Sequence, residues 1–333
     1  MLDGTEGPVT AVTQVGDVFQ VDTTASKERT VLDEPAAALD QSQRRPISDA
    51  LRLDGGLLAM STGEGCDEIE VVDLSAQEGR FRRVALPDAL GCPPVAFAGG
   101  LLAPTQVGQV LLLDPRSGGK LVEPFQPPLH SGEQLAWSAP AVAKGSEVVL
   151  ADGRTKLYRL GVVERPQPHL AALDQATLSQ PIVSPVAAID EVVCAVDAGG
   201  VLRVFALPKL TPVEGAEQAL NGRCDFGPRR VGQHVLLSSD DGRLLCLDSK
   251  GKTLWQADLP YGPLAGTPVA DGAQFLLASV DGVVWRVDAA TGRELGKIET
   301  GRPLGTGPLL VRGRLLLGGR DGAIYFIEPP PAP

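Results

Sequence analysis

The chain has 333 residues, of which 43% are hydrophobic and 21% charged, and this composition excludes a disordered protein. Its 39 glycines and 28 prolines are too many for a helical protein and are typical of short strands joined by tight turns. The net charge of −11 disfavours nucleic acid and membrane surfaces as partners, because both are anionic. Aromatic residues make up only 4%, which also disfavours stacking of single-stranded nucleic acid.

The N-terminal part of the chain carries strand-like sequence almost from its start. Residues 11–22 match the second and third strands of the repeat described below. Residues 1–4 lack the basic and apolar regions of a secretory signal, and no apolar stretch is long enough to cross a membrane. We therefore expect no direct membrane insertion. We also expect a piece of a longer bacterial protein, with a cytoplasmic location if the chain is complete and an extracytoplasmic one if it is an excised domain.

A repeat of about forty residues runs through the chain. Residues 235–255, 275–295 and 315–328 align without a gap. Each unit has apolar runs separated by glycine-containing turns, such as Asp281-Gly282, which is a strong hairpin signal because glycine accepts a positive φ. Four antiparallel strands per unit are the content of a propeller blade. The repeats start near residues 8, 46, 94, 140, 185, 228, 268 and 308.

These repeats predict an all-β protein, a single β-propeller domain over residues 1–333 with four-stranded antiparallel blades. Seven clear starts and a short one at Pro8 allow seven or eight blades, and we favour eight. The last repeat ends near Glu328 without a fourth strand. We expect the run Arg29-Thr30-Val31-Leu32 to complete it, so that strands from both ends of the chain close the ring. Residues 167–178 are expected to hold a helical turn at most.

Residues 244–255 (LLCLDSKGKTLW) and 283–295 (VVWRVDAATGREL) resemble the PQQ-like propeller repeat. The resemblance is good over residues 228–328 and looser over residues 46–227. It implies the superfamily that includes quinoprotein alcohol dehydrogenases and the BamB-type outer-membrane assembly lipoprotein. Because many functions share one fold, the repeat says little about function by itself.

The quinoprotein dehydrogenases of this superfamily hold PQQ with a calcium ion, a catalytic aspartate and a vicinal disulfide. No two cysteines of this chain are adjacent in sequence, and the stacked tryptophans of those enzymes are lost, since only Trp137, Trp255 and Trp285 remain. We therefore expect a non-catalytic member of the family, with no cofactor.

The titratable residues form no catalytic or metal-binding motif. The three histidines lie in different repeats, and no C-x-x-C pair occurs. The aspartates that end the third strands recur with the repeat, which predicts that they accept hydrogen bonds from turn N–H groups. These are Asp73, Asp114, Asp248 and Asp288. We expect no catalytic residue and no metal.

The five cysteines are an odd number, so at least one is unpaired within the chain. Cys194 and Cys246 lie inside apolar strand patterns and are predicted to be buried. Whether two of Cys66, Cys92 and Cys224 form a disulfide is not decided by the sequence.

The loops that join each fourth strand to the next first strand gather at one mouth of a propeller, where ligands usually bind. Tryptophan, tyrosine and arginine dominate the energetics of interfaces, and Arg229 and Arg230 replace apolar residues at the start of a first strand. There they could meet an acidic partner. The alternative is that all are ordinary solvated residues. The candidate partner-binding residues are Trp137, Arg223, Arg229, Arg230, Tyr261 and Arg302.

The sequence thus predicts a non-enzymatic, monomeric protein-interaction or scaffold module that binds a protein or peptide partner and no nucleic acid. Its rigid strands would present loops that carry the specificity. Two alternatives from other classes stay open. One is a small-ligand sensor, such as a carbohydrate-binding domain of a larger signalling protein, and the other is a quinoprotein-like or hydrolytic enzyme.

Overall fold

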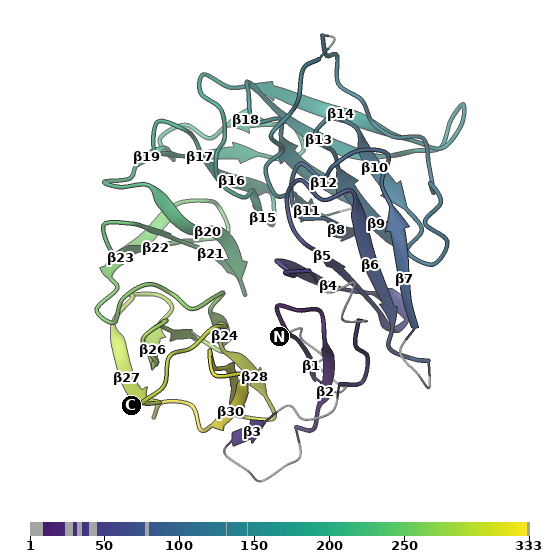
Figure 1. The fold of residues 1–333 in the computed structure, drawn as a ribbon. Coiled ribbons are helices and arrows are strands. Elements are labelled where there is room, and N and C mark those ends of the chain that lie inside the picture. Colours follow the sequence, from purple (N-terminus) through teal and green to yellow (C-terminus); the bar gives the residue numbers. More distant parts are fainter. Residues whose placement is uncertain are drawn as a thin grey trace. The chain divides into compact units, whose positions relative to one another are not determined.

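The computed structural model describes residues 9–23, 29–31, 35–39, 45–76, 80–130, 132–144 and 146–331. Strands provide nearly all the regular structure of these residues, and their one helical element is the three-residue 3₁₀ turn Asp54–Gly56 (Figure 1). No helix in the described ranges has the length and apolar character needed to span a membrane. The predicted all-β class is confirmed.

The chain forms two compact units, which are described separately. The first unit comprises Met1–Val12, Val18–Pro35 and Leu220–Pro333, and the second comprises Thr13–Asp17 and Ala36–Ala219. Each unit is built from antiparallel sheets that follow one another along the chain. Sheets of three or more strands are called blades here and are numbered in chain order.

The second unit contains blades 1 to 4. Blade 1 consists of β4 (Asp49–Leu53), β5 (Leu57–Ser61), β6 (Glu68–Asp73) and β7 (Arg80–Ala85). Blade 2 consists of β8 (Val95–Phe97), β9 (Gly100–Pro104) and β10 (Val110–Leu113). Blade 3 consists of β11 (Ala141–Ala143), β12 (Glu147–Ala151), β13 (Lys156–Val163) and β14 (His169–Thr177). Blade 4 consists of β15 (Ala187–Ile189), β16 (Val192–Val196), β17 (Val201–Ala206), β18 (Thr211–Pro212) and β19 (Gln218–Ala219).

The first unit contains blades 5 to 7 and a two-stranded sheet. Blade 5 consists of β20 (Cys224–Val231), β21 (His234–Ser239), β22 (Arg243–Leu247) and β23 (Thr253–Asp258). Blade 6 consists of β24 (Val269–Asp271), β25 (Gln274–Ala278), β26 (Val283–Asp288) and β27 (Glu294–Glu299). Blade 7 consists of β28 (Leu309–Val311), β29 (Arg314–Gly318), β30 (Ala323–Ile327) and β3 (Arg29–Val31). The small sheet pairs β1 (Val9–Val12) with β2 (Val18–Val21).

The second strand of most blades is buried along nearly its whole length, because it lies between two neighbouring strands and packs on both faces of the sheet. Consecutive sheets within a unit share apolar clusters. Leu57 and Leu101 join blades 1 and 2, for example, and Leu276 and Leu315 join blades 6 and 7. A blade that lies between two others of its unit buries apolar side chains on both faces, which explains continuous buried runs such as Gly100–Pro104.

The N-terminal strand completes the last blade, as predicted. Thr30 pairs with Ile324, and β3 becomes the fourth strand of blade 7, whereas Leu32 lies outside the described residues. The short repeat that starts at Pro8 contributes only the two-stranded sheet β1–β2. The fold therefore has seven blades, which was the alternative count, and the favoured count of eight was wrong.

Residues 167–178 contain no helical turn, and most of them form the strand β14. The strand pairs with β13 from Val163–His169 to Lys156–Thr177. The strand lacks the regular alternation of buried and exposed side chains, since Leu170 is its one buried residue. The long pairing with β13, which no local pattern reveals, decides the conformation.

All five cysteines are free thiols, so no disulfide joins Cys66, Cys92 or Cys224. Cys194 and Cys246 are fully buried, as predicted. Burial raises the pKa of Cys224 to about 11 and that of Cys246 to about 12, so both thiols stay protonated and unreactive at neutral pH.

Candidate functional site

The aspartates at the ends of the third strands hold the turns that follow them, as predicted. Asp248 accepts hydrogen bonds from the backbone N–H groups of Lys250 and Lys252 at 2.9 and 2.8 Å. Asp288 does the same for Ala290 and Thr291. The position recurs because it fixes a turn, which is a structural role.

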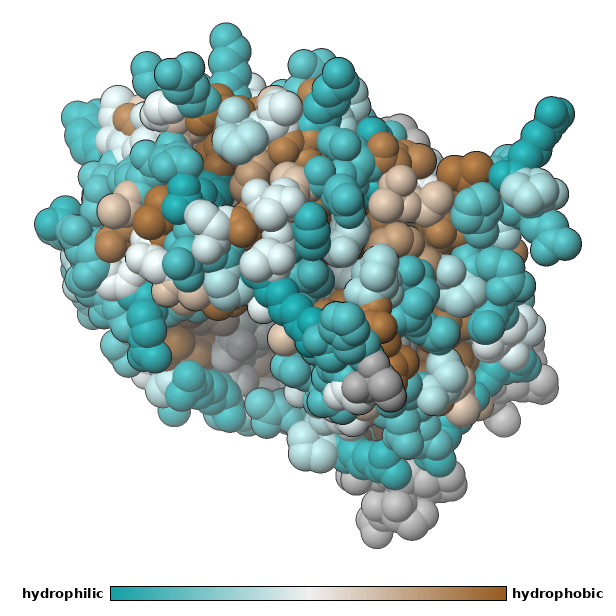
Figure 2. Space-filling view, turned by 90° about the horizontal axis from the view of Figure 1, so that it is seen from above, coloured by the Kyte–Doolittle hydropathy of each residue, from teal (hydrophilic) through white to brown (hydrophobic). Residues whose placement is uncertain are grey.

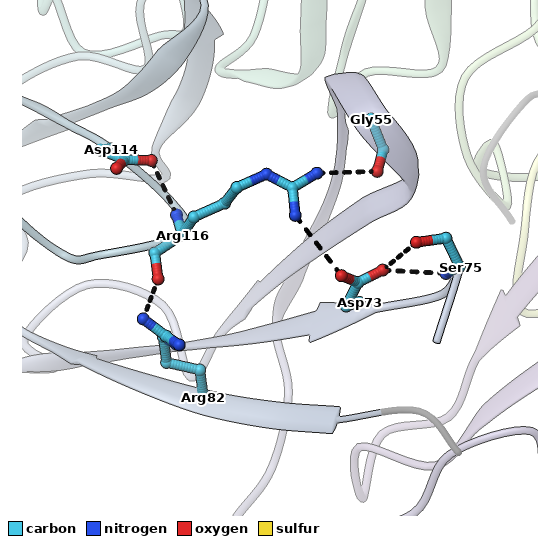
Figure 3. Close-up of polar contacts among 6 residues, drawn as sticks. All are labelled: Gly55, Asp73, Ser75, Arg82, Asp114 and Arg116. Carbon is cyan, nitrogen blue, oxygen red and sulfur yellow. Dashed lines mark hydrogen bonds and ion pairs between the residues drawn. The ribbon is translucent and has the colours of Figure 1, made fainter. Parts of the chain in front are cut away.

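The same aspartates in blades 1 and 2 are linked by Arg116 (Figure 3). Its guanidinium donates to the Gly55 carbonyl at 3.2 Å and forms an ion pair with Asp73 at 3.5 Å. Its backbone N–H donates to Asp114 at 2.9 Å, and its carbonyl accepts a hydrogen bond from Arg82. Arg116 thus ties the last turn of blade 2 to blade 1.

These turns predict an acid-sensitive contribution to stability. Hydrogen bonds from Ser75 and Ser117 hold the pKa values of Asp73 and Asp114 below the usual range. A lowered pKa in the folded state stabilises the protein above about pH 4, the ordinary aspartate value, and the contribution is lost as the pH falls through and below it. We expect the double variant Asp73→Asn/Asp114→Asn to lose less stability than the parent between pH 7 and pH 3 in urea unfolding. Equal losses would contradict this role.

A cavity of about 230 Å³ lies beside the Arg116 turn in the second unit. The turns between first and second strands of three blades line it, through Asp54, Phe97 and Ser146, together with Pro115. Asp54 is the one ionisable side chain in its lining.

Two of the predicted partner-binding residues flank one hairpin of blade 6. The N–H of Val280 donates to the carbonyl of Pro263, which follows the Tyr261 loop. On the other side, Thr300 donates to the Gly282 carbonyl, next to Arg302. The loops that carry Tyr261 and Arg302 therefore lie on either side of the turn Asp281-Gly282.

Arg223 belongs to the same series of loops, one blade earlier. Its N–H donates to Asp240 at 2.9 Å, and the N–H of Leu259 donates to the carbonyl of Gly242. We call this continuous surface of the first unit the loop row. It comprises the loops 221–223, 259–263 and 300–303 and the turns 240–242, 280–282 and 320–322.

The arginines of the loop row differ in whether a carboxylate neutralises them. Arg223 pairs with Asp240 at 3.2 Å, and the Tyr261 hydroxyl donates to Glu294 at 2.8 Å. Arg302 and Arg320 are exposed, and neither guanidinium has an ion-pair partner among the described residues. They are neighbours, because the Arg320 N–H donates to the Pro303 carbonyl at 3.1 Å.

Arg320 was not among the predicted residues, although comparison of the repeats could have identified it. It stands directly before the turn Asp321-Gly322, at a position where the preceding repeat has the apolar Val280 before Asp281-Gly282.

The other three predicted residues lie elsewhere. Trp137 is 4% exposed, and its Nε1–H donates to the Thr105 carbonyl at 2.9 Å, so it is part of the core. Arg229 and Arg230 are exposed in β20 but pair with Leu236 and Val235, toward the turn at the far end of the strand from Arg223. The structure therefore brings together three of the six candidates: Arg223, Tyr261 and Arg302.

Hydrophilic residues cover most of the face shown in Figure 2, and hydrophobic residues form scattered patches among them. A surface of this kind favours recognition by charged and polar contacts over burial of a broad apolar area.

Comparisons with known proteins agree with the predicted repeats. Residues 190–329 match the family model described as outer membrane protein assembly factor BamB. The structure is similar to the crystal structure of BamB from Moraxella catarrhalis, with a TM-score of 0.65 and 17% identity, covering 96% of this chain and 93% of that one. It is also similar to the computationally designed Ika8 protein, with a TM-score of 0.67 and 13% identity, covering 98% and 94%. No curated protein sequence matches the chain.

At these identities the solved structures show a shared fold, and the family model adds the repeat sequence over the C-terminal part. The family model confirms the predicted resemblance over residues 190–329, and the chain has a β-propeller fold that is similar to that of BamB.

Proposed function

We propose that this protein is a non-enzymatic interaction module that binds an acidic segment of a protein partner through Arg302 and Arg320 of the loop row. The observation that carries the proposal is a pair of exposed guanidiniums on neighbouring loops, without an ion-pair partner in the described part of the chain, on a protein with a net charge of −11. The similarity to BamB, an assembly factor, supports a protein as the partner.

The chemistry of the pair favours a carboxylate-bearing partner. A guanidinium presents several N–H donors in a plane, which matches a carboxylate in bidentate geometry. The remainder of the acidic surface would repel an acidic segment, so binding would be confined to this place. Tyr261, which is held by Glu294 and packs edge-on against Trp285 at 5.4 Å, supplies a rigid aromatic neighbour along the row.

A photo-crosslinker tests the proposal in the organism that makes the protein. Benzoylphenylalanine in place of the exposed Pro303, which leaves both arginines intact, should capture one specific partner, and the same group at Lys250, an exposed turn residue, should not. The captured partner would then be purified for binding measurements.

The double variant Arg302→Glu/Arg320→Glu should weaken binding of that partner by at least about tenfold, and added salt should weaken the parent complex in the same direction. The matched control, Lys250→Glu, should leave the affinity unchanged. Equal affinities for the parent and the double variant would overturn the proposal.

A further inference from the structure

Blade 4 departs from the repeat at one position in its third strand. Five other blades place a buried apolar or aromatic residue there. These residues are Leu111, Tyr158, Leu245, Trp285 and Tyr325, all at most 8% exposed. Blade 4 has Arg203 at this position, opposite Ala195 of β16.

The residue that covers this third-strand position also differs between blades 4 and 6. In blade 6, Tyr261 covers Trp285 in an edge-on contact, and its hydroxyl donates to Glu294 of the fourth strand. The carbonyl of Pro181 in blade 4 and that of Pro263 in blade 6 each accept a hydrogen bond from the turn between the second and third strands. The two prolines are therefore equivalent, and Ser179, two residues before Pro181, corresponds to Tyr261, two residues before Pro263. A small residue thus replaces an aromatic one directly over Arg203.

The fourth strand of blade 4 is interrupted beside the same position. β18 pairs with Phe205 and Ala206, β19 pairs with Val201 and Leu202, and the chain between them carries Glu217. Arg203 donates to the buried carboxylate of Asp197 at 2.7 Å and forms an ion pair with Glu217 at 2.5 Å. Both carboxylates hold the guanidinium at its edges.

A cavity of about 180 Å³ lies beside Arg203, between Ser179 and Glu217. Its inner wall is apolar, formed by Leu178, Ile182 and Phe205, which are buried. Its rim is polar and exposed at Ser179 and Gln180. The volume lies below the roughly 300 Å³ at which pockets for drug-sized molecules begin, so it suits a single ring.

We propose that this cavity binds a 4-hydroxyphenyl ring, either a tyrosine side chain of a protein segment or a small phenol. The ring would take the place that Tyr261 has in blade 6. Its face would lie on the Arg203 guanidinium, whose edges are occupied by carboxylates, and on the apolar wall. Its hydroxyl would donate to Glu217, as the hydroxyl of Tyr261 donates to Glu294. The inference is independent of the loop row.

Ligand-observed NMR titrations of the full chain test this site. N-acetyltyrosinamide should bind saturably, with a dissociation constant on the order of 1 mM for so small a ligand. N-acetylphenylalaninamide, which lacks the hydroxyl, should bind at least threefold more weakly. p-Cresol separates the two sources, since tighter binding of the amide indicates a protein segment and tighter binding of p-cresol a small phenol.

Variants locate the binding. Ser179→Tyr fills the cavity from within and should abolish the response, whereas Lys250→Tyr, which adds a tyrosine to an exposed turn, should leave it unchanged. Glu217→Ala, at an exposed residue, should remove the preference for the hydroxylated ligand and serves if Ser179→Tyr does not fold. Absence of saturable binding by the parent, an unchanged response in Ser179→Tyr, or an unchanged preference in Glu217→Ala would overturn the site.

Discussion

Replacing Trp255 with alanine should lower the free energy of unfolding by about 3–5 kcal/mol, the usual cost of emptying a buried tryptophan site. Trp255 ends the repeat of blade 5 and is 8% exposed. Its Nε1–H donates to the Ala289 carbonyl of blade 6 at 2.8 Å. The indole also packs on Gly292, where an added Cβ would come within 2.6 Å of the ring. The variant therefore loses both a large apolar contact and a hydrogen bond between blades.

Two controls separate these contributions in urea unfolding. Trp255→Phe keeps an aromatic ring and loses the N–H donor, so it should cost about 1–3 kcal/mol, the penalty for an unsatisfied buried carbonyl. Leu254→Ala changes the adjacent, 43% exposed side chain and should stay within about 0.5 kcal/mol. If the alanine variants at 254 and 255 cost the same, Trp255 does not connect the blades.

The fold was predictable because its signals repeat. Turns such as Asp281-Gly282 recur at a fixed spacing, so each repeat strengthens the assignment of the others. The role of Asp288 followed from the same regularity, and its hydrogen bonds to turn N–H groups confirm it. Even the pairing of β3 with the last blade followed from counting strands at the two ends of the chain.

The site was harder to predict because it depends on which loops meet. Trp137 is in loop-like sequence, yet a partner 32 residues earlier, the Thr105 carbonyl, fixes it in the core. Arg229 and Arg223 are six positions apart in sequence, but they lie toward opposite ends of one strand. Arg203 was visible in the sequence as a charged residue at a position that is apolar or aromatic in five other blades, whereas blade 1 has Glu70 there. Its meaning required the cavity, which depends on the separate segments that carry Ser179 and Glu217.

The same blade gives the second large expected effect. Asp197→Ala should lower the free energy of unfolding by about 3–5 kcal/mol, because it breaks a buried ion pair by removing one partner. Asp197 is 2% exposed, and one of its oxygens accepts hydrogen bonds from the N–H groups of Gly199 and Val201 at 2.9 and 3.0 Å. The other oxygen accepts from Arg203, which the variant leaves with Glu217 alone.

A double-mutant cycle in urea unfolding tests the origin of this cost. Arg203→Leu restores the apolar residue found at this position in other blades, so Asp197→Ala should cost less in its presence than in the parent. Asp281→Ala, at the exposed hairpin aspartate of blade 6, should stay within about 0.5 kcal/mol. If the costs of Asp197→Ala and Arg203→Leu simply add, Asp197 stabilises only the turn between β16 and β17, through Gly199 and Val201. A large coupling would instead show that blade 4 retains a charged network at a core position that other blades fill with apolar side chains, which is expected where a fold keeps a binding site at the expense of packing.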